Sequence, residues 1–578
     1  MLKQKIFQCL ALTQAVNFAL SLTLPTGDDA PFLQINDDGT SVIGNILWNA
    51  TMTSNGAKPA YYKGKDIVSN ASGFYFSFAG QSEDFNWHSP KIVDASTDWI
   101  DVQYESNYGN LHWVIDRTTA GAWQYFMNTA LPHSLGEFRC LWRLDNGTFT
   151  HGHNYIKDEV LPTLAETNEG IVVQDSTNQL PNGTYITKYD WSSFINVPEA
   201  GFWGVYGGSF GSWFIHPSKE YINGDHLKQE LMVHRENPSG DTVQLNMLHG
   251  THFMDGPRDD PAVNRTWGPW LWYLNDGEAS DAATRAAKEV AQWPYDFPSM
   301  SINPAYQSRA LSVKGRIVLT DDTPAANVSV FLGDNRSDVK TLDQGTNYYY
   351  RETTDSSGNF RFTAVRSGTY GLYAWPAQGS PMGYISTNFT ANDISVTESS
   401  ESLDIGVFKW KPQGRDLIWQ LGTLDRLANE FKNGDSGYHH GLTDDSPANL
   451  TFKIGESKVS DWYYVQSAEG TWTIKFDLNS TSNLDSESIL TVSVAGYGDK
   501  CYIDITAQGG SVDLGVLEHL QGDPSTYRSS TSNGVSRVYF FTIPAGTFVV
   551  GSNTIEFTVT NSNRWRGYMW DSILLEWA

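Results

Sequence analysis

The sequence predicts an all-β protein built from several domains, and three observations support this fold class. The chain has 578 residues, which is enough for three or four domains. Aromatic residues make up 13% of it and charged residues only 18%, a composition unlike that of disordered or coiled-coil chains. Its apolar residues fall in short aromatic and β-branched runs separated by Gly, Asn, Asp and Ser, which is typical of strands joined by turns.

The first domain is expected over residues 22–305, as a large antiparallel β-sandwich. Its strands are predicted at three runs: Gly73–Ala79, Leu111–Ile115 and Gly201–Tyr206. One convincing helix is predicted, over Ala279–Trp293, because this stretch is rich in alanine and offers Ser280 and Asp281 as capping residues. Pro294 ends it.

The second domain is expected over residues 306–409, as a small β-sandwich of immunoglobulin-like size, roughly 100 residues. Apolar and polar residues alternate with a period of two in four runs: Val313–Leu319, Val328–Leu332, Asn359–Thr363 and Tyr370–Trp375. Turn signals separate the runs, such as Thr323-Pro324 and Ser357-Gly358. The whole pattern resembles the fibronectin III-like or carboxypeptidase-regulatory-like spacers found in many secreted carbohydrate enzymes.

The third domain is expected over residues 410–578, as a jelly-roll sandwich. Alternation returns in three runs and the chain closes on a long apolar one: Trp472–Leu478, Leu490–Ala495, Thr554–Val559 and Tyr568–Trp577. No internal repeat and no low-complexity tract is visible in the sequence.

Charge and cysteine content exclude several classes of partner. The formal net charge is −26, which argues against a protein that binds nucleic acid or an anionic membrane through its overall field. The chain has three cysteines and no Cys/His zinc spacing, so neither a disulfide framework nor a metal site is expected. No cofactor is expected either.

The beginning of the chain reads as a secretory signal peptide over residues 1–21, with a basic start, an apolar stretch and small residues near a cleavage point at 19–21. The alternative is an amino-terminal core helix. Asn-x-Ser/Thr sequons recur along the chain, at Asn49, Asn70, Asn146, Asn182, Asn264, Asn327, Asn335, Asn388, Asn449 and Asn479. Ten such sites behind a leader predict a secreted, extracellular glycoprotein.

Two hydrolase signatures are weak. Gly207–Gly211 matches the GxSxG pattern of serine hydrolases, but strand-like residues follow it, whereas that motif requires a strand–turn–helix elbow. A glycosidase needs a pair of carboxylates, one acid and one base or nucleophile. Nothing in the sequence selects such a pair among the nominal candidates, Glu105, Asp116, Glu230 and Asp255.

A basic and aromatic stretch is the most distinctive feature of the chain. Lys188 lies among Tyr185, Tyr189 and Trp191, and Arg139 and Arg143 lie upstream in GEFRCLWRL. Histidines follow downstream, at His234, His249 and His252, with Trp203 between. Arginine and lysine among aromatic rings suit an anionic sugar, because ring faces stack on apolar sugar faces while arginine binds a carboxylate.

These motifs together resemble the rhamnogalacturonan lyases of polysaccharide lyase family 4, in the branch of the fungal lyases B and C. The similarity rests on five patterns: GEFR before W-R-L, T-K-Y, W-F-I-H-P-S-K-E-Y, L-K-Q-E-L-M-V-H and L-H-G-T-H-F. The resemblance implies a catalytic β-sandwich, a fibronectin III-like domain and a carbohydrate-binding-module-like jelly roll. It also implies a monomer that cleaves rhamnogalacturonan I, a pectin polysaccharide, by β-elimination.

The resemblance assigns the site residues. It implies Lys188 as the base that removes the C5 proton of galacturonate, and Arg139 as the arginine near the uronate, with Arg143 as its rival. His234 is the expected acid or base partner, and His249 and His252 are the next candidates for that role. In the short fungal branch of the family the catalytic histidine stands at a different position. Substrate contacts are expected from Arg143, His249, His252, Tyr189, Trp191 and Trp203.

Alternatives remain at this stage. Lys188 pairs only with the carboxylate if a histidine takes the proton. A lectin-like pectin-binding protein would keep the fold without the chemistry, and a glycoside hydrolase of similar architecture would give a saturated product.

Overall fold

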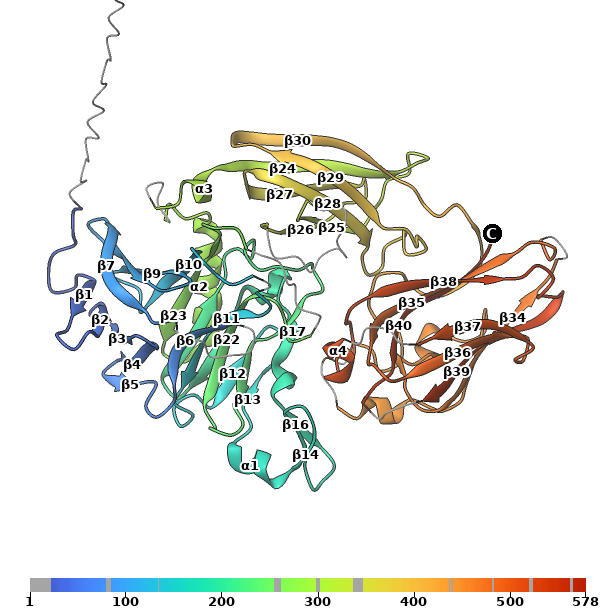
Figure 1. The fold of residues 1–578 in the computed structure, drawn as a ribbon, viewed down its shortest axis with the longest axis horizontal. Coiled ribbons are helices and arrows are strands. Elements are labelled where there is room, and N and C mark those ends of the chain that lie inside the picture. Colours follow the sequence, from blue (N-terminus) through green and yellow to red (C-terminus); the bar gives the residue numbers. More distant parts are fainter. Residues whose placement is uncertain are drawn as a thin grey trace, which may run out of the picture.

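The computed structural model describes residues 22–78, 85–133, 135–253, 261–297, 302–335, 347–435, 437, 440–480, 483–518, 523–561 and 565–578. The expected leader, residue 79 and Asp255 lie outside these ranges. Strands dominate, in three successive groups of sheets, so the all-β multidomain fold is confirmed (Figure 1). No helix among the described residues is long and apolar enough to cross a membrane.

The first domain is a sandwich of two nine-stranded sheets. Sheet 1 contains β1 (Phe32–Ile35), β2 (Ser41–Gly44), β3 (Trp48–Thr53), β4 (Gly56–Tyr62), β5 (Lys65–Asp66), β6 (Gly73–Phe78), β11 (Phe138–Leu144), β22 (Thr242–His249) and β21 (Val233–Arg235). Sheet 2 contains β13 (Asp158–Val160), β12 (His151–His153), β18 (Phe202–Gly207), β19 (Phe210–Ile215), β23 (Thr266–Asn275), β10 (Gly121–Asn128), β9 (Gly109–Asp116), β8 (Trp99–Glu105) and β7 (His88–Ala95).

Short elements complete the domain beside these sheets: α1 (Leu164–Glu169), β14 (Ile171–Gln174), β15 (Thr177–Gln179), β16 (Tyr185–Thr187), η1 (Lys188–Trp191), β17 (Ser192–Phe194), η2 (Pro198–Gly201) and β20 (Gln229–Leu231). The strands β14, β15 and β16 form one small sheet, and β17 pairs with β20. These elements carry the T-K-Y motif to the edge of sheet 1.

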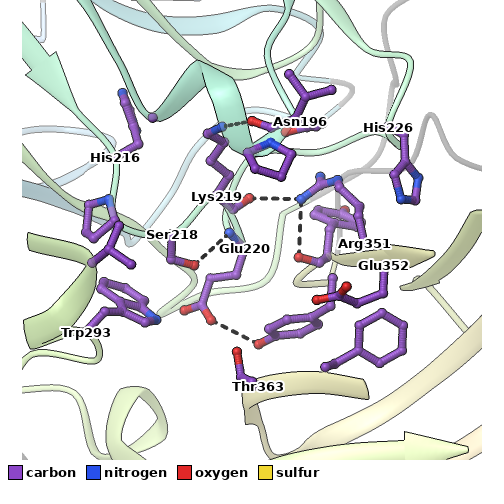
Figure 2. A pocket seen from close by; sticks show the side chains of 18 of the residues that line it. Asn196, His216, Ser218, Lys219, Glu220, His226, Trp293, Arg351, Glu352 and Thr363 are labelled. Atoms are coloured by element: carbon purple, nitrogen blue, oxygen red, sulfur yellow. Dashed lines mark hydrogen bonds between the residues drawn. The ribbon is translucent and has the colours of Figure 1, made fainter. Parts of the chain in front are cut away.

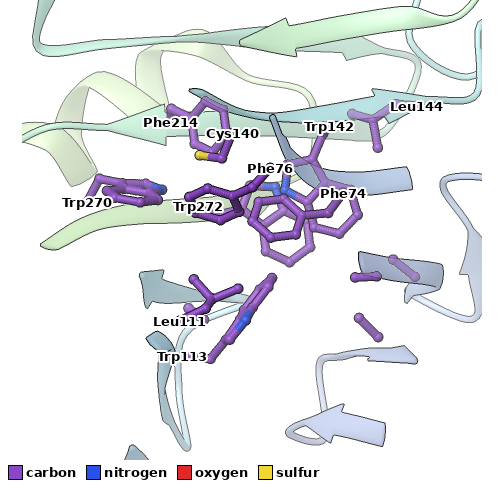
Figure 3. Close-up of a cluster of buried hydrophobic side chains, with 14 of the residues drawn as sticks. Phe74, Phe76, Leu111, Trp113, Cys140, Trp142, Leu144, Phe214, Trp270 and Trp272 are labelled. Atoms are coloured by element: carbon purple, nitrogen blue, oxygen red, sulfur yellow. The ribbon is translucent and has the colours of Figure 1, made fainter. Parts of the chain in front are cut away.

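Aromatic rings fill the space between the two large sheets (Figure 3). Trp142 of β11 and Trp272 of β23 stack with ring centroids 4.3 Å apart, and Phe74 packs against Trp142 at 5.2 Å. Because side chains alternate across a strand, the residues on either side of Trp142 face away from this core. That alternation sends Arg139 and Arg143 to the outer face of sheet 1.

Two details of the first domain bear on the sequence predictions. The Gly207–Gly211 motif forms the turn between β18 and β19, which pair as a hairpin, so it is not a nucleophile elbow. Helix α2 spans Ala279–Gln292, but its N-cap is Glu278, which makes no capping hydrogen bond. The expected cap Asp281 lies inside the first turn and accepts from Tyr273 and Asn275.

The second domain begins after α3 (Pro304–Gln307), within which the predicted boundary at 305 falls. One sheet has β27 (Asn359–Arg366), β24 (Arg309–Leu319) and β30 (Ser399–Trp410). The other has β26 (Tyr350–Thr353), β25 (Val328–Gly333), β28 (Gly368–Pro376) and β29 (Phe389–Val396). The predicted boundary at 410 coincides with the end of β30.

The third domain is also a two-sheet sandwich. One sheet has β31 (Asp416–Gly422), β40 (Tyr568–Trp577), β35 (Ser488–Tyr497), β38 (Arg537–Ile543) and β33 (Val465–Gln466). The other has β32 (Leu450–Lys453), β34 (Gly470–Leu478), β39 (Gly551–Asn561), β36 (Tyr502–Ala507) and β37 (Val512–Leu517). Its short helical elements are η3 (Leu442–Asp445), η4 (Val459–Asp461) and α4 (Pro524–Tyr527).

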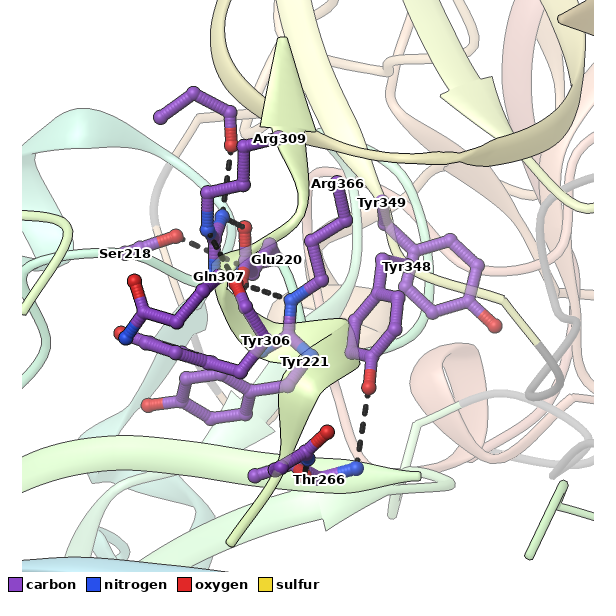
Figure 4. Close-up of polar contacts among 12 residues, drawn as sticks. Ser218, Glu220, Tyr221, Thr266, Tyr306, Gln307, Arg309, Tyr348, Tyr349 and Arg366 are labelled. Carbon is purple, nitrogen blue, oxygen red and sulfur yellow. Dashed lines mark hydrogen bonds and ion pairs between the residues drawn. The ribbon is translucent and has the colours of Figure 1, made fainter. Parts of the chain in front are cut away.

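A buried ion cluster joins the first two domains (Figure 4). Glu220 of the first domain accepts two hydrogen bonds of 2.8 Å from Arg309 and one of 2.7 Å from Arg366, both of the second domain. Tyr350 donates a fourth, at 3.0 Å. Burial opposes ionisation of Glu220, but the two guanidinium groups hold its pKa at about 2.

Candidate functional site

The outer face of sheet 1 carries the basic residues that the sequence singled out. Arg139 and Arg143 lie on β11, two strands from His234 on β21, with β22 between them. Val243 of β22 is the register partner of both Arg143 and His234. Since Val233 packs in the core of the sandwich, the next side chain, His234, faces the same side as the arginines.

The two arginines differ in how fully they are paired. Arg143 donates to Tyr75 at 2.9 Å and to Glu236 at 3.2 Å, and Asp241 lies 3.8 Å from it. Arg139 donates from Nε to Ser77 at 2.9 Å, and its Nη1 lies 3.6 Å from Glu137. The Nη2 of Arg139 has no hydrogen-bond partner among the described residues, and its side chain is 19% exposed. Arg139 therefore has free capacity for an external carboxylate.

His252 orients Arg139 from the side. Its Nδ1 lies 2.5 Å from the carboxylate of Glu230, which is fully buried, and its Nε2 lies 3.2 Å from Nη1 of Arg139. Because the guanidinium can only donate, Nε2 of His252 accepts from it through its lone pair, and the ring proton lies on Nδ1, which donates to Glu230. Glu230, one of the nominal glycosidase carboxylates, thus serves as an internal acceptor.

Lys188 is the first residue of η1, which Thr187 caps by accepting from the Tyr189 amide at 3.2 Å. This turn packs against β21 and so brings Lys188 to the histidine strand. The amine lies 5.1 Å from the centroid of the Tyr189 ring and has no hydrogen bond or ion pair to any described residue. Burial lowers its pKa; Asp175 and Glu236 oppose the shift, while Arg528 and Arg139 add to it.

His234 is held as a neutral imidazole. Its Nε2 lies 3.2 Å from Glu236, and its buried Nδ1 has no partner among the described residues. Burial lowers the pKa of His234 to about 4, against the opposing effect of Glu236. Burial of Glu236 is outweighed by its hydrogen bond with His234 and by the charges of Arg143 and Lys188, which hold its pKa at about 2. Electrostatic coupling thus links Lys188, His234 and both arginines in one cluster.

Tyr189 lies beside Lys188, but its side chain supports the structure around the site and is not open to a substrate. Its side chain is buried and its hydroxyl donates to Asp175 at 2.6 Å. His249 is also buried; its Nδ1 donates to the carbonyl of Gly136 at 2.6 Å, and burial lowers its pKa to about 3. The charges that act on it are those of Arg265 and Lys228, not Lys188.

The two tryptophans expected to contact substrate lie in the hydrophobic core instead. Trp203 is fully buried, stacks on His216 at 4.4 Å and donates to the carbonyl of Leu245. Trp191 is 2% exposed, with the amine of Lys157 4.9 Å from its ring. In this packing neither ring has a free face for a sugar, because the apolar runs that suggested them form the core itself.

The structure adds residues that the sequence did not suggest. Glu236 follows His234 by two positions, directly after β21 ends, and its carboxylate lies 3.2 Å from the His234 ring; the spacing of two is a signal that alternation could have supplied. Asp175 acts on Lys188 from the turn between β14 and β15, and Arg528 acts on it from the third domain; no local pattern marks either. Among the described residues, no group of three or more His, Cys, Asp and Glu side chains could hold a metal ion.

A cavity of about 610 Å³ lies elsewhere, between the first and second domains (Figure 2). Its cations are already engaged: Lys219 donates to the carbonyl of Val197, and Arg351 donates to those of Ile222 and Gly224. Burial, with Arg351 nearby, lowers the pKa of Lys219 to about 7. Because Lys219 and Arg351 are engaged by main-chain carbonyls, and Glu220 of the same lining belongs to the joint of Figure 4, we place the candidate site on sheet 1 instead.

Comparison with known proteins assigns the domains. Residues 312–402 match the family model for domain II of polysaccharide lyase family 4, and residues 417–575 match that for domain III. A rhamnogalacturonate lyase of Dickeya dadantii is 28% identical over 90% of this chain and 91% of its own length. Rhamnogalacturonate lyase B of Emericella nidulans is 26% identical over 64% of this chain and 63% of its own.

A probable rhamnogalacturonate lyase B of Aspergillus niger is 26% identical over 54% of this chain and 46% of its own length. The bacterial relative thus aligns along more of the chain than these two fungal ones. Behind its β-sandwich this chain therefore carries regions that match domains II and III of polysaccharide lyase family 4, and it is similar to a rhamnogalacturonate lyase along nine-tenths of both chains.

Proposed function

We propose that this protein is a rhamnogalacturonan lyase that cuts the rhamnose–galacturonate bond of rhamnogalacturonan I by β-elimination. The relatives named above are rhamnogalacturonate lyases or probable ones. The one from Dickeya dadantii aligns with 90% of this chain, and the two fungal ones align with 64% and 54% of it. One observation carries the proposal at the site: the amine of Lys188 has no hydrogen-bond partner among the described residues and lies in the field of Arg139. A base and a carboxylate-binding cation are what elimination beside a uronate requires.

In the proposed step, Nζ of Lys188 takes the proton from C5 of the galacturonate. The electron pair of that C–H bond forms the C4=C5 double bond, and the C4–O bond to rhamnose breaks with its electrons on oxygen. Arg139 neutralises the carboxylate on C5, which stabilises the charge that develops there. The product is a 4,5-unsaturated galacturonate at the new non-reducing end, and the leaving oxygen takes a proton.

Lys188 also supplies that proton in this scheme, because neither nearby histidine has one to give. His234 has its Nε2 directed to Glu236 and His252 has its Nδ1 directed to Glu230. Each neutral imidazole then presents a lone pair at its other nitrogen. We therefore assign positioning roles to His234 and His252, and the acid and base roles to the ammonium and amine forms of Lys188.

The proposed setting is extracellular. We propose secretion through the leader at residues 1–21, N-glycosylation at the sequons and action as a monomer. None of the ten sequon asparagines is buried in the structure, so each is accessible to modification.

The test is the appearance of ultraviolet-absorbing unsaturated product on rhamnogalacturonan I, with homogalacturonan as the matched control polymer. We expect product from the first substrate and little from the second. Cleavage of homogalacturonan alone would reject the substrate assignment. Cleavage of rhamnogalacturonan without ultraviolet absorbance would identify a hydrolase, and binding without cleavage would identify a lectin.

A further inference from the structure

An arginine of the third domain reaches the candidate site of the first. Arg528 follows α4 and donates to one carboxylate oxygen of Asp175 from Nη2 at 2.9 Å and from Nε at 3.2 Å. Its Nη1 donates to the main-chain carbonyl of His252. The guanidinium carbon lies 4.7 Å from the centroid of the Tyr189 ring. Arg528 therefore touches the two segments that carry Lys188 and the partner of Arg139.

Further hydrogen bonds dock the third domain at this point. The amide of Ser525 donates to the carbonyl of Phe253 at 3.1 Å, and the Ser525 hydroxyl donates to the same oxygen. The hydroxyl of Ser530 donates to the side chain of Gln229 at 2.9 Å. Both serines are buried. Because these bonds flank Arg528, the docked position of the domain fixes where the guanidinium lies.

Arg528 changes what Lys188 faces. The charges of Asp175, Glu236, Arg139 and Arg528 act on Lys188, which in turn acts on His234, and the titratable Tyr189 ring lies 5.1 Å from the Lys188 amine. Asp175 already accepts from Tyr189, and Arg528 neutralises its remaining charge. Without Arg528, the carboxylate of Asp175 would be free to attract the ammonium form of Lys188, and a nearby positive charge that disfavours that form would be lost.

We propose that Arg528 is a positioning residue for the lyase reaction, through which the docked third domain keeps Lys188 unpaired and directed to the uronate. This inference rests on the proposed function. Under this inference the third domain contributes a residue to the surroundings of Lys188. Its resemblance to a carbohydrate-binding module then describes its fold but not its whole role. Arg528 itself does not touch the reacting atoms.

The test is the pH profile of kcat/KM for unsaturated product formation. Arg528→Ala should raise the pKa of Lys188, so the rising limb of the profile should move to higher pH by on the order of one unit. At pH values below the rising limb, kcat/KM of Arg528→Ala should be about tenfold lower than that of the unmodified protein. At alkaline pH the two values should become equal. Arg528→Lys keeps the positive charge and should recover part of the loss.

Two further variants separate charge from docking. Asp175→Asn removes the negative partner, so the limb should move in the opposite direction, to lower pH. Ser525→Ala removes an uncharged contact of the same interface and should leave the limb in place. An Arg528→Ala profile that falls equally at every pH, or does not move, would overturn the inference.

A second readout does not depend on turnover. The rate at which an amine-acylating reagent labels Lys188, measured by peptide mass spectrometry across pH, reports the fraction of free amine. The pH at which labelling of Lys188 reaches half of its maximum rate should also be higher in Arg528→Ala. If the unmodified protein forms no unsaturated product, the proposed function fails; an unmoved labelling midpoint rejects the role of Arg528 whether or not product forms.

Discussion

The first domain meets its neighbours at two charged regions, and their chemistry is opposite. At the joint with the second domain, Glu220 is fully buried and accepts four hydrogen bonds, from Arg309, Arg366 and Tyr350. Near the third domain, Lys188 has no hydrogen-bond partner among the described residues, and neither does Nδ1 of His234. Satisfied charges hold domains together, whereas unsatisfied ones are available for a substrate.

The largest effect is expected where the pairing is complete. Glu220→Gln leaves two buried guanidinium groups without their carboxylate, which should cost about 3–5 kcal/mol of stability. Thermal unfolding should shift to lower temperature, while kcat/KM of the folded enzyme at 25 °C should stay unchanged. A Glu220→Gln variant that is stable but has a lower kcat/KM would mean that the Glu220 cluster contributes to the reaction. The difference between this cluster and the Lys188 region would then not hold.

The next effect concerns Arg139, whose Nη2 has no hydrogen-bond partner among the described residues. Arg139→Ala should lower kcat/KM by roughly 10²–10³-fold, the usual cost of removing a group that stabilises developing charge. Arg139→Lys should restore only part of it, because lysine lacks the planar fork that binds a carboxylate. Arg143→Ala is the comparison: a larger loss there than in Arg139→Ala would transfer the uronate contact to Arg143.

A smaller effect is expected from the carboxylate behind His252. Glu230→Gln replaces a charge-assisted hydrogen bond with a neutral one, so Arg139 is held less firmly and kcat/KM should fall about tenfold. Glu105→Gln, at a surface ion pair with Lys91, is the matched control and should have no effect. Complete loss of activity in Glu230→Gln, as expected of a glycosidase acid, would contradict the positioning role.

The sequence predicted the fold class because alternation and turn residues are local signals, and β34 and β40 lie where those signals place strands. It also selected Arg139, Lys188 and His234, whose roles stay predictions; Arg139 and His234 lie on the two strands of sheet 1 that flank β22, and the turn that begins at Lys188 packs against the strand of His234. Local composition could not tell a core ring from a substrate platform, so Trp203 was misjudged. Arg528 depends on the docking of one domain on another, which no local pattern encodes.

The assignment of Lys188 as the base is tested most directly by Lys188→Arg, measured as unsaturated product from rhamnogalacturonan I, with Lys157→Arg as the matched control. Arginine keeps the positive charge but does not lose its proton near neutral pH, so it cannot accept the C5 proton. The account predicts a loss of roughly 10²–10⁴-fold, with the fold intact and the control unaffected. A Lys188→Arg enzyme that retains most of its activity would contradict the account, because Lys188 would then only neutralise the uronate.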